Sequence, residues 1–160
     1  MAFEVCRQLE AAGVAHAMID TDELDRIYPA PVDDPHKTDL ARRNLAAVWA
    51  SLRAAGAPRL ILTMVAVSLQ DELTNVRQAI PEARIVTARL RASEDDLLGR
   101  VGGREVGSGY DYQALRTIEQ SRSMARESTG GPLVVDTSGR PVVEVAREVL
   151  GRAQRSAGFW

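Results

Sequence analysis

The sequence predicts an α/β fold in three layers, a mostly parallel sheet with helices on both faces. Four short apolar runs, each the length of one strand, alternate with longer segments whose apolar residues recur at helical spacing. A further helical segment precedes the first run. Hydrophobic residues make up 45% of the 160 residues and charged residues 26%, which is typical of a globular protein and not of a disordered or collagen-like chain.

Glycine, proline and capping residues delimit the elements expected in the first half of the chain. Gly13 and Gly56 end two helices, and Ser68 with Asp71 has the pattern of a capping box that opens a third. Three prolines between residues 29 and 35 predict a loop. The expected elements are a helix over 2–12, a strand over 14–19, a helix over 38–55, a strand over 60–63 and a helix over 69–80.

Similar signals delimit the second half. Ser93 and Asp96 repeat the capping-box pattern, and Pro141 suits the first position of a helix. Residues 99–109 hold five of the 12 glycines, which predicts a mobile loop that carries arginines. The expected elements are a strand over 85–90, a helix over 93–101, a helix over 112–127, a strand over 133–135 and a final helix from Pro141.

Length, charge and cysteine content limit the classes of protein to consider. The length suits one domain, expected over residues 1–152, with a polar tail over 153–160. No apolar run approaches the ~18 residues of a membrane span, and a net charge of −2 gives no general attraction to nucleic acid or to a membrane surface. A single cysteine and an N-terminus without a secretory signal predict a cytoplasmic protein.

Ligands of parallel sheets bind at the carboxyl ends of strands, so the residues there are the candidate site. Asp20 and Asp22 lie about 7 Å apart on one side of an extended segment, where they could hold a metal, accept a proton or orient a substrate hydroxyl. The alternative is that Asp22 or Thr21 only caps the short helix that follows. The other residues at such positions are Thr63, Arg91 and Asp136-Thr137.

Arginine and amide side chains supply further candidates. Arg100 and Arg104 of the glycine-rich segment could close over phosphates, to which arginine makes bidentate contacts. A flexible surface loop is the alternative. Asn44, near the start of the long helix, could reach a ligand at the sheet edge, while Arg43 next to it fits a ligand contact or a solvated helix face.

Other reactive residue types are scarce. Lys37 is the only lysine, so any function that requires a lysine must use it. His16 and His36 have no Cys or His partners at ligand spacing, so no zinc site is expected. Cys6 has no evident basic activator and is expected to be a small core residue.

Four of these segments, taken in order, resemble the small-molecule branch of the P-loop kinases, to which adenylylsulfate kinase and gluconate kinase belong. The resemblance runs from residue 1 to about Arg152. The matching segments are Asp20-Thr21-Asp22 after a strand, Arg43-Asn44-Leu45 on the long helix, residues 98–105 as an arginine-bearing lid, and Asp136-Thr137-Ser138-Gly139-Arg140-Pro141 before the final helix.

The resemblance implies an ATP-dependent kinase that transfers phosphate to a small-molecule acceptor, with ATP and Mg²⁺ as cofactors. It does not identify the acceptor. The residues that it implies for acceptor binding are Asp20, Asp22, Arg43 and Asn44. Those that it implies for binding the nucleotide or its phosphates are Arg100, Arg104, Thr137 and Gly139.

One motif of that family has no counterpart in the 160 residues: the loop Gly-x-x-x-x-Gly-Lys-Ser/Thr and the strand before it. Because that loop holds the β- and γ-phosphates, we expect ATP binding of the family type to be impaired. The strand is central in such sheets, so its neighbours must pair directly or leave backbone groups unsatisfied. A start placed too late, or a truncated and inactive remnant, would account for the difference.

Two other functions stay open. In a haloacid-dehalogenase-type phosphatase, Asp20 would be the nucleophile, Asp22 the acid and Thr63 a phosphate ligand, and Lys37 is the only lysine available to it. In a non-catalytic, kinase-like remnant, the chain would bind a ligand or a partner, and an opened sheet would favour self-association.

Overall fold

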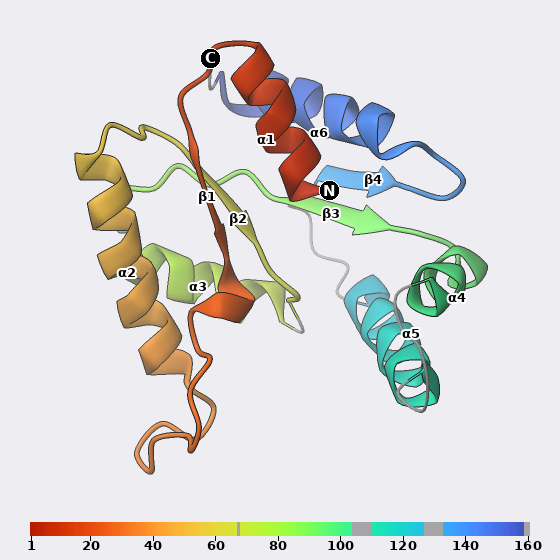
Figure 1. Ribbon diagram of the computed structural model, residues 1–160, viewed down its shortest axis with the longest axis horizontal. Coiled ribbons are helices and arrows are strands. Elements are labelled where there is room, and N and C mark those ends of the chain that lie inside the picture. Colours follow the sequence, from red (N-terminus) through yellow and green to blue (C-terminus); the bar gives the residue numbers. More distant parts are fainter. Residues whose placement is uncertain (67, 104–109, 127–132, 159–160) are drawn as a thin grey trace. The chain divides into compact units, whose positions relative to one another are not determined.

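The computed structural model describes residues 1–66, 68–103, 110–126 and 133–158 (Figure 1). The chain divides into two compact units, an N-terminal unit over Ala2–Ile85 and a C-terminal unit over Val86–Trp160 together with Met1. The sequence predicted a single domain over 1–152, whereas each unit has a small parallel sheet of its own.

The N-terminal unit is built on the strand pair β1–β2, whose parallel register places Ile19 opposite Leu62. Helices α2 and α3 pack against each other and, with Ile19, enclose an apolar core (Figure 1). The buried side chains of this core are Ile19, Leu24, Leu45, Trp49, Val76 and Ile80. The elements are α1 (Ala2–Ala11), β1 (Ala17–Asp20), the 3-10 helix η1 (Thr21–Glu23), α2 (Thr38–Ala54), β2 (Leu60–Thr63) and α3 (Leu69–Ala79).

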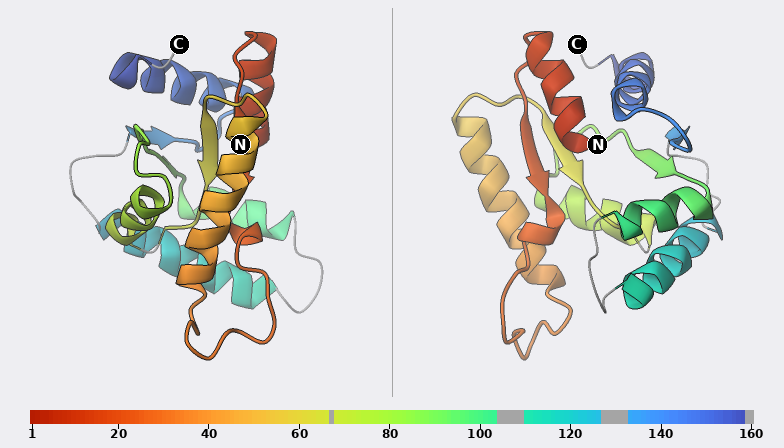
Figure 2. Two further views of the ribbon diagram at one scale, coloured as in Figure 1. Left: turned by 90° about the vertical axis from the view of Figure 1, so that its left-hand side faces the viewer. Right: turned by 45° about the vertical axis from the view of Figure 1, so that its right-hand side comes forward.

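The C-terminal unit is built on the strand pair β3–β4, which is also parallel and places Arg91 opposite Asp136. Helix α6 packs along β4, and α4 packs against α5 (Figure 2). Val135 of β4 and Val145 of α6 are its most completely buried large side chains. The elements are β3 (Ala88–Arg91), α4 (Glu94–Gly102), α5 (Tyr110–Arg126), β4 (Leu133–Asp136) and α6 (Val142–Ala157).

The serine caps and the glycine after α1 are confirmed, whereas Pro141, expected at the first position of a helix, is the N-cap residue of α6. The Ser68 and Ser93 hydroxyls accept the backbone N–H of Asp71 and Asp96 at 3.4 and 3.2 Å, as capping boxes do. Gly13, at φ 68°, follows α1 in the left-handed conformation that glycine adopts without strain.

The α/β class and the parallel pairing are confirmed, and the structure differs from the sequence in detail. The strand expected over 14–19 begins at Ala17, and the strand expected over 85–90 is Ala88–Arg91. Helix α6 continues to Ala157, so most of the segment expected as a tail over 153–160 is helical. The four described strands form two separate sheets. Within the described ranges, no helix is both long and apolar enough to cross a membrane.

Candidate functional site

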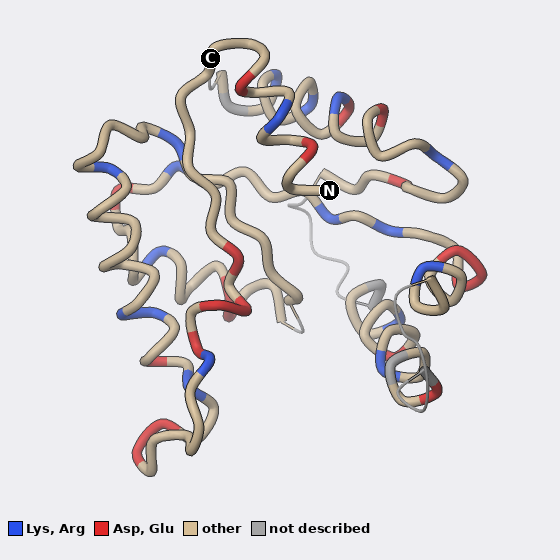
Figure 3. The backbone as a smooth tube through the Cα atoms, viewed as in Figure 1, with Lys and Arg blue, Asp and Glu red and all other residues tan. Residues whose placement is uncertain are grey.

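The carboxyl end of β1 carries the first predicted site residue. Asp20, the last residue of β1, lies in register with Thr63, the last residue of β2, so the two share one edge of the N-terminal sheet. The Asp20 Oδ1 atom accepts a hydrogen bond of 3.2 Å from the backbone N–H of Asp22 and caps η1. The sequence offered Thr21 or Asp22 for this capping role, and the structure gives it to Asp20. Acidic residues follow β1 closely in Figure 3.

Helix α2 brings one of its two predicted residues to this segment. Asn44 Nδ2 donates a hydrogen bond of 2.7 Å to the backbone carbonyl of Leu24, whose side chain is buried in the core. Arg43 is exposed, and its Nε donates to the carbonyl of Asp39 one turn earlier in α2, at 3.4 Å. The structure therefore joins Asn44 to the Asp20–Leu24 segment and keeps Arg43 on its own helix.

Lys37 has a contact that the sequence did not predict. It precedes α2 with a φ of 57°, and its Nζ donates to the backbone carbonyl of Asp25 at 2.9 Å. The same Nζ lies 3.2 Å from the Asp25 carboxylate. A second bond, from the backbone N–H of Leu40 to the Asp34 carboxylate at 2.9 Å, fixes the loop to the start of α2. The only lysine is thus part of the anchor of the loop between η1 and α2.

Two of the residues predicted to contact phosphate meet in the C-terminal unit. Arg100 of α4 donates from one terminal nitrogen to Thr137 Oγ1 at 3.0 Å and from the other to the Thr137 carbonyl at 2.9 Å. Thr137 is only 4% exposed, and its hydroxyl donates to the carbonyl of Arg91 at 3.0 Å. Arg100 itself is exposed to solvent. The sequence predicted a loop over 99–109, but α4 continues to Gly102, so Arg100 lies on a helix. Arg104, the other predicted lid arginine, lies outside the described residues.

A network of polar side chains lies in the turn after β4. The sequence predicted that these residues lie at the end of the strand, but it did not predict the hydrogen bonds between them. Asp136 accepts the backbone N–H of Ser138 at 2.9 Å and the Arg91 Nε at 3.1 Å. The Ser138 backbone N–H is the main reason that the pKa of Asp136 lies below its usual value, and the Ser138 hydroxyl and Arg91 add to the effect. The Ser138 hydroxyl also accepts the backbone N–H of Ser93 at 2.9 Å, next to the start of α4. Gly139, at φ 61°, completes the turn.

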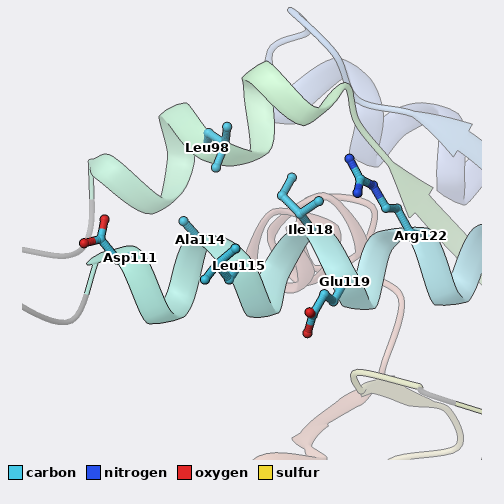
Figure 4. Close-up of a pocket in the computed structure, with 7 residues that line it drawn as sticks. All are labelled: Leu98, Asp111, Ala114, Leu115, Ile118, Glu119 and Arg122. Carbon is cyan, nitrogen blue, oxygen red and sulfur yellow. The ribbon is translucent and has the colours of Figure 1, made fainter.

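A groove of about 540 Å³ lies between α4 and α5 (Figure 4). Arg122 at one end of it donates two hydrogen bonds to Glu94, at 2.8 and 2.9 Å. The predicted site residues that the structure describes lie elsewhere. The residues that line the groove are Leu98, Ala114, Leu115 and Ile118, with Asp111, Glu119 and Arg122 as the charged ones.

The remaining reactive side chains have ordinary surroundings. The His16 Nδ1 atom lies 2.8 Å from the carbonyl of Val14, and the ring is half-buried. Cys6 is buried, and this burial raises the pKa of its thiol. Among the residues that the structure describes, no three His, Cys, Asp or Glu side chains come together as metal ligands would. Asp22 lies in η1 and not in the extended segment that the sequence predicted, so the expected placement of Asp20 and Asp22 on one side of a strand is wrong.

Comparison with known proteins identified no relative of this chain: no family model, no curated protein and no solved structure matches it.

Proposed function

We propose that this chain carries the acceptor-binding and lid elements of an ATP-dependent kinase for a small-molecule acceptor, in a three-layer P-loop-like α/β fold. The bond from Asn44 to the Leu24 carbonyl is the observation that carries the proposal. It joins the Asn-bearing helix of the resemblance to Leu24, which follows η1 and lies two residues after Asp22. An acceptor hydroxyl bound near Asp20 and Asp22 would therefore meet a backbone that this bond and the cap of η1 hold in place.

The contacts of Arg100 support a phosphate-binding role in the C-terminal unit. Its two bonds to Thr137 hold the guanidinium beside the turn that follows β4, and the residue is exposed to solvent. A guanidinium carries a permanent positive charge in a planar fork that matches the geometry of a phosphate, which is the chemistry that the proposal assigns to Arg100. The residues proposed to bind the acceptor belong to the N-terminal unit, and those proposed to bind phosphate belong to the C-terminal unit. The contacts within each unit support the corresponding half of the proposal.

The residues present do not supply the phosphate cradle that ATP and Mg²⁺ require in this family. No Gly-x-x-x-x-Gly-Lys-Ser/Thr loop occurs in the 160 residues, and the only lysine is bound to Asp25. The proposal therefore assigns acceptor and lid contacts to this chain and derives no phosphoryl-transfer step from it.

Chemical-shift mapping by NMR of the ¹⁵N-labelled protein tests the two halves separately. We expect a nucleoside monophosphate, gluconate or adenylylsulfate to shift the amides of Asp20–Leu24 and Asn44, and magnesium ATP to shift those of Arg100 and Thr137. The acceptor shifts should be lost in Asp22→Asn and kept in Asp39→Asn, a matched change on the exposed start of α2. If none of the acceptors and nucleotides shifts either set, the kinase proposal is wrong and a non-catalytic role is favoured.

The register of Asp20 with Thr63 favours a second candidate, a magnesium-dependent phosphatase of the haloacid-dehalogenase type. The Asp20 carboxylate would attack phosphorus and form an aspartyl phosphate, while Asp22 would protonate the leaving alcohol; water would then release phosphate. Hydrolysis of p-nitrophenyl phosphate with Mg²⁺ and without a nucleotide, lost in Asp20→Asn and kept in Asp39→Asn, would support this candidate over the kinase.

A further inference from the structure

The strand β4 directs its backbone groups to two different edges. The backbone N–H groups of Leu133 and Thr137 donate to carbonyls on the β3 side, to Thr87 and Arg91, both at 2.8 Å. Because alternate residues of a strand point their N–H and C=O groups to opposite sides, residues 134 and 136 present theirs to the other edge. Helix α6, which follows the turn after β4, packs against the strand.

Two arginines occupy both outward carbonyls of that edge. Arg152 Nη1 donates to the carbonyl of Val134 at 2.6 Å, and Arg140 Nη1 donates to the carbonyl of Asp136 at 2.9 Å. Glu148 of α6 accepts from the same two nitrogens, at 3.3 Å from Arg152 and 2.7 Å from Arg140. We call Arg140, Glu148 and Arg152 the edge clamp, since one carboxylate holds two guanidinium groups on two strand carbonyls.

We propose that the edge clamp closes the outer edge of β4 to strand addition by a second copy of this chain. An added strand needs the carbonyls of residues 134 and 136 as acceptors, and the clamp already fills both with charged donors. The edge is otherwise suited to self-pairing, because three of the four β4 residues are apolar.

The symmetry of such a pairing explains why the partner would be a second copy. Two β4 strands that meet antiparallel about Val135 would place residue 134 of each copy opposite residue 136 of the other. Each outward residue would then exchange both of its backbone hydrogen bonds, and the two Asp136 carboxylates would lie at opposite ends of the pair. The clamp therefore acts as a barrier to a self-complementary interface.

Sedimentation of the full chain across a roughly hundredfold range of concentration tests the proposal, because self-association depends on mass action. The test variant is Arg140→Ala with Arg152→Ala. The matched control is Arg147→Ala with Arg155→Ala, which removes the same two charges from exposed positions of α6. We expect the average mass of the test variant to rise towards a dimer or larger with concentration, and the control to follow the wild type. Hydrogen exchange should show that the amides of Val134 and Asp136 become protected as the mass rises.

Equal masses for the wild type and both variants would overturn the proposal, and so would association without protection of the β4 amides. Circular dichroism establishes whether the test variant is folded. Should it unfold, Glu148→Ala provides the decision, because it keeps both arginines and removes the carboxylate that fixes them. We expect Glu148→Ala to associate more than the control, and a Glu148→Ala protein with the wild-type mass would also overturn the proposal.

Discussion

The side-chain amide of Asn44 donates a hydrogen bond of 2.7 Å to the backbone carbonyl of Leu24, twenty residues earlier in the chain. Leu24 directly follows η1, so the bond fixes the end of the segment that begins at Asp20. The bond lies next to the N-terminal core. Leu24 is buried in that core together with Leu45, which follows Asn44 on α2. Asn44 thus holds the end of η1, the short helix that Asp20 caps.

Replacing Asn44 with alanine should destabilise the protein by about 1–2 kcal/mol, because it removes the donor to the half-buried Leu24 carbonyl. The measurement is the free energy of unfolding in urea. Arg43→Ala is the matched control on the same helix, since Arg43 is exposed and, among the residues that the structure describes, donates to the carbonyl of Asp39 one turn earlier. We expect that control to change the free energy by no more than about 0.5 kcal/mol. Equal losses in the two variants would contradict the anchoring role of Asn44.

Thr137→Val should also destabilise the protein, by about 1–3 kcal/mol, because it keeps the shape of a buried side chain and deletes its hydroxyl. The deletion leaves the Arg91 carbonyl without one donor and Arg100 without one acceptor. Thr137→Ser keeps the hydroxyl and should lose less stability in the same urea titration. A Thr137→Val protein as stable as the wild type would show that these bonds contribute no net stability.

Signals that lie within a few residues of one another were predicted from the sequence. The capping serines Ser68 and Ser93 are examples, because the cap and the amide it accepts are three residues apart. Strand ends were predicted less well. The apolar run that starts at Ile85 predicted a strand from that residue, but pairing begins at Ala88, where Leu133 lies opposite. The partner strand, 45 residues away in the sequence, decides where the ladder begins.

The same distinction applies to the candidate site. Positions at strand ends, such as Asp20 and Thr137, follow from the α/β pattern and were predicted from the sequence. Their bonding partners depend on tertiary packing over tens of residues, as between Arg100 and Thr137, and were not predicted. The edge clamp was missed in part for the same reason. The i, i+4 spacing of Glu148 and Arg152 is a local signal for that pair, but nothing local marks Arg140, eight residues before Glu148, as its second partner.

Val135→Ala should cost about 2 kcal/mol of stability, because the Val135 side chain is 0% exposed and its removal leaves a cavity beside α6. Val134→Ala is the control in the same strand, with a side chain that is 40% exposed and faces the opposite side. We expect the control to lose less than half as much stability in thermal or urea unfolding. A larger loss for Val134→Ala would mean that the buried face of β4 has been assigned wrongly.

Asp136 should make part of the stability depend on pH. The backbone N–H of Ser138, the Ser138 hydroxyl and Arg91 lower the pKa of the Asp136 carboxyl in the folded protein. A carboxyl with a lowered folded pKa stabilises the fold above its unfolded pKa, about 4, and loses that contribution as the pH falls through the folded value. Asp136→Asn keeps an oxygen for the Ser138 N–H and removes the charge. The melting temperature of Asp136→Asn should therefore lie below that of the wild type near neutral pH, and the difference should shrink as the pH falls through the lowered pKa of the Asp136 carboxyl. A gap that stays constant over this range would mean that the ionised carboxylate contributes nothing to the fold.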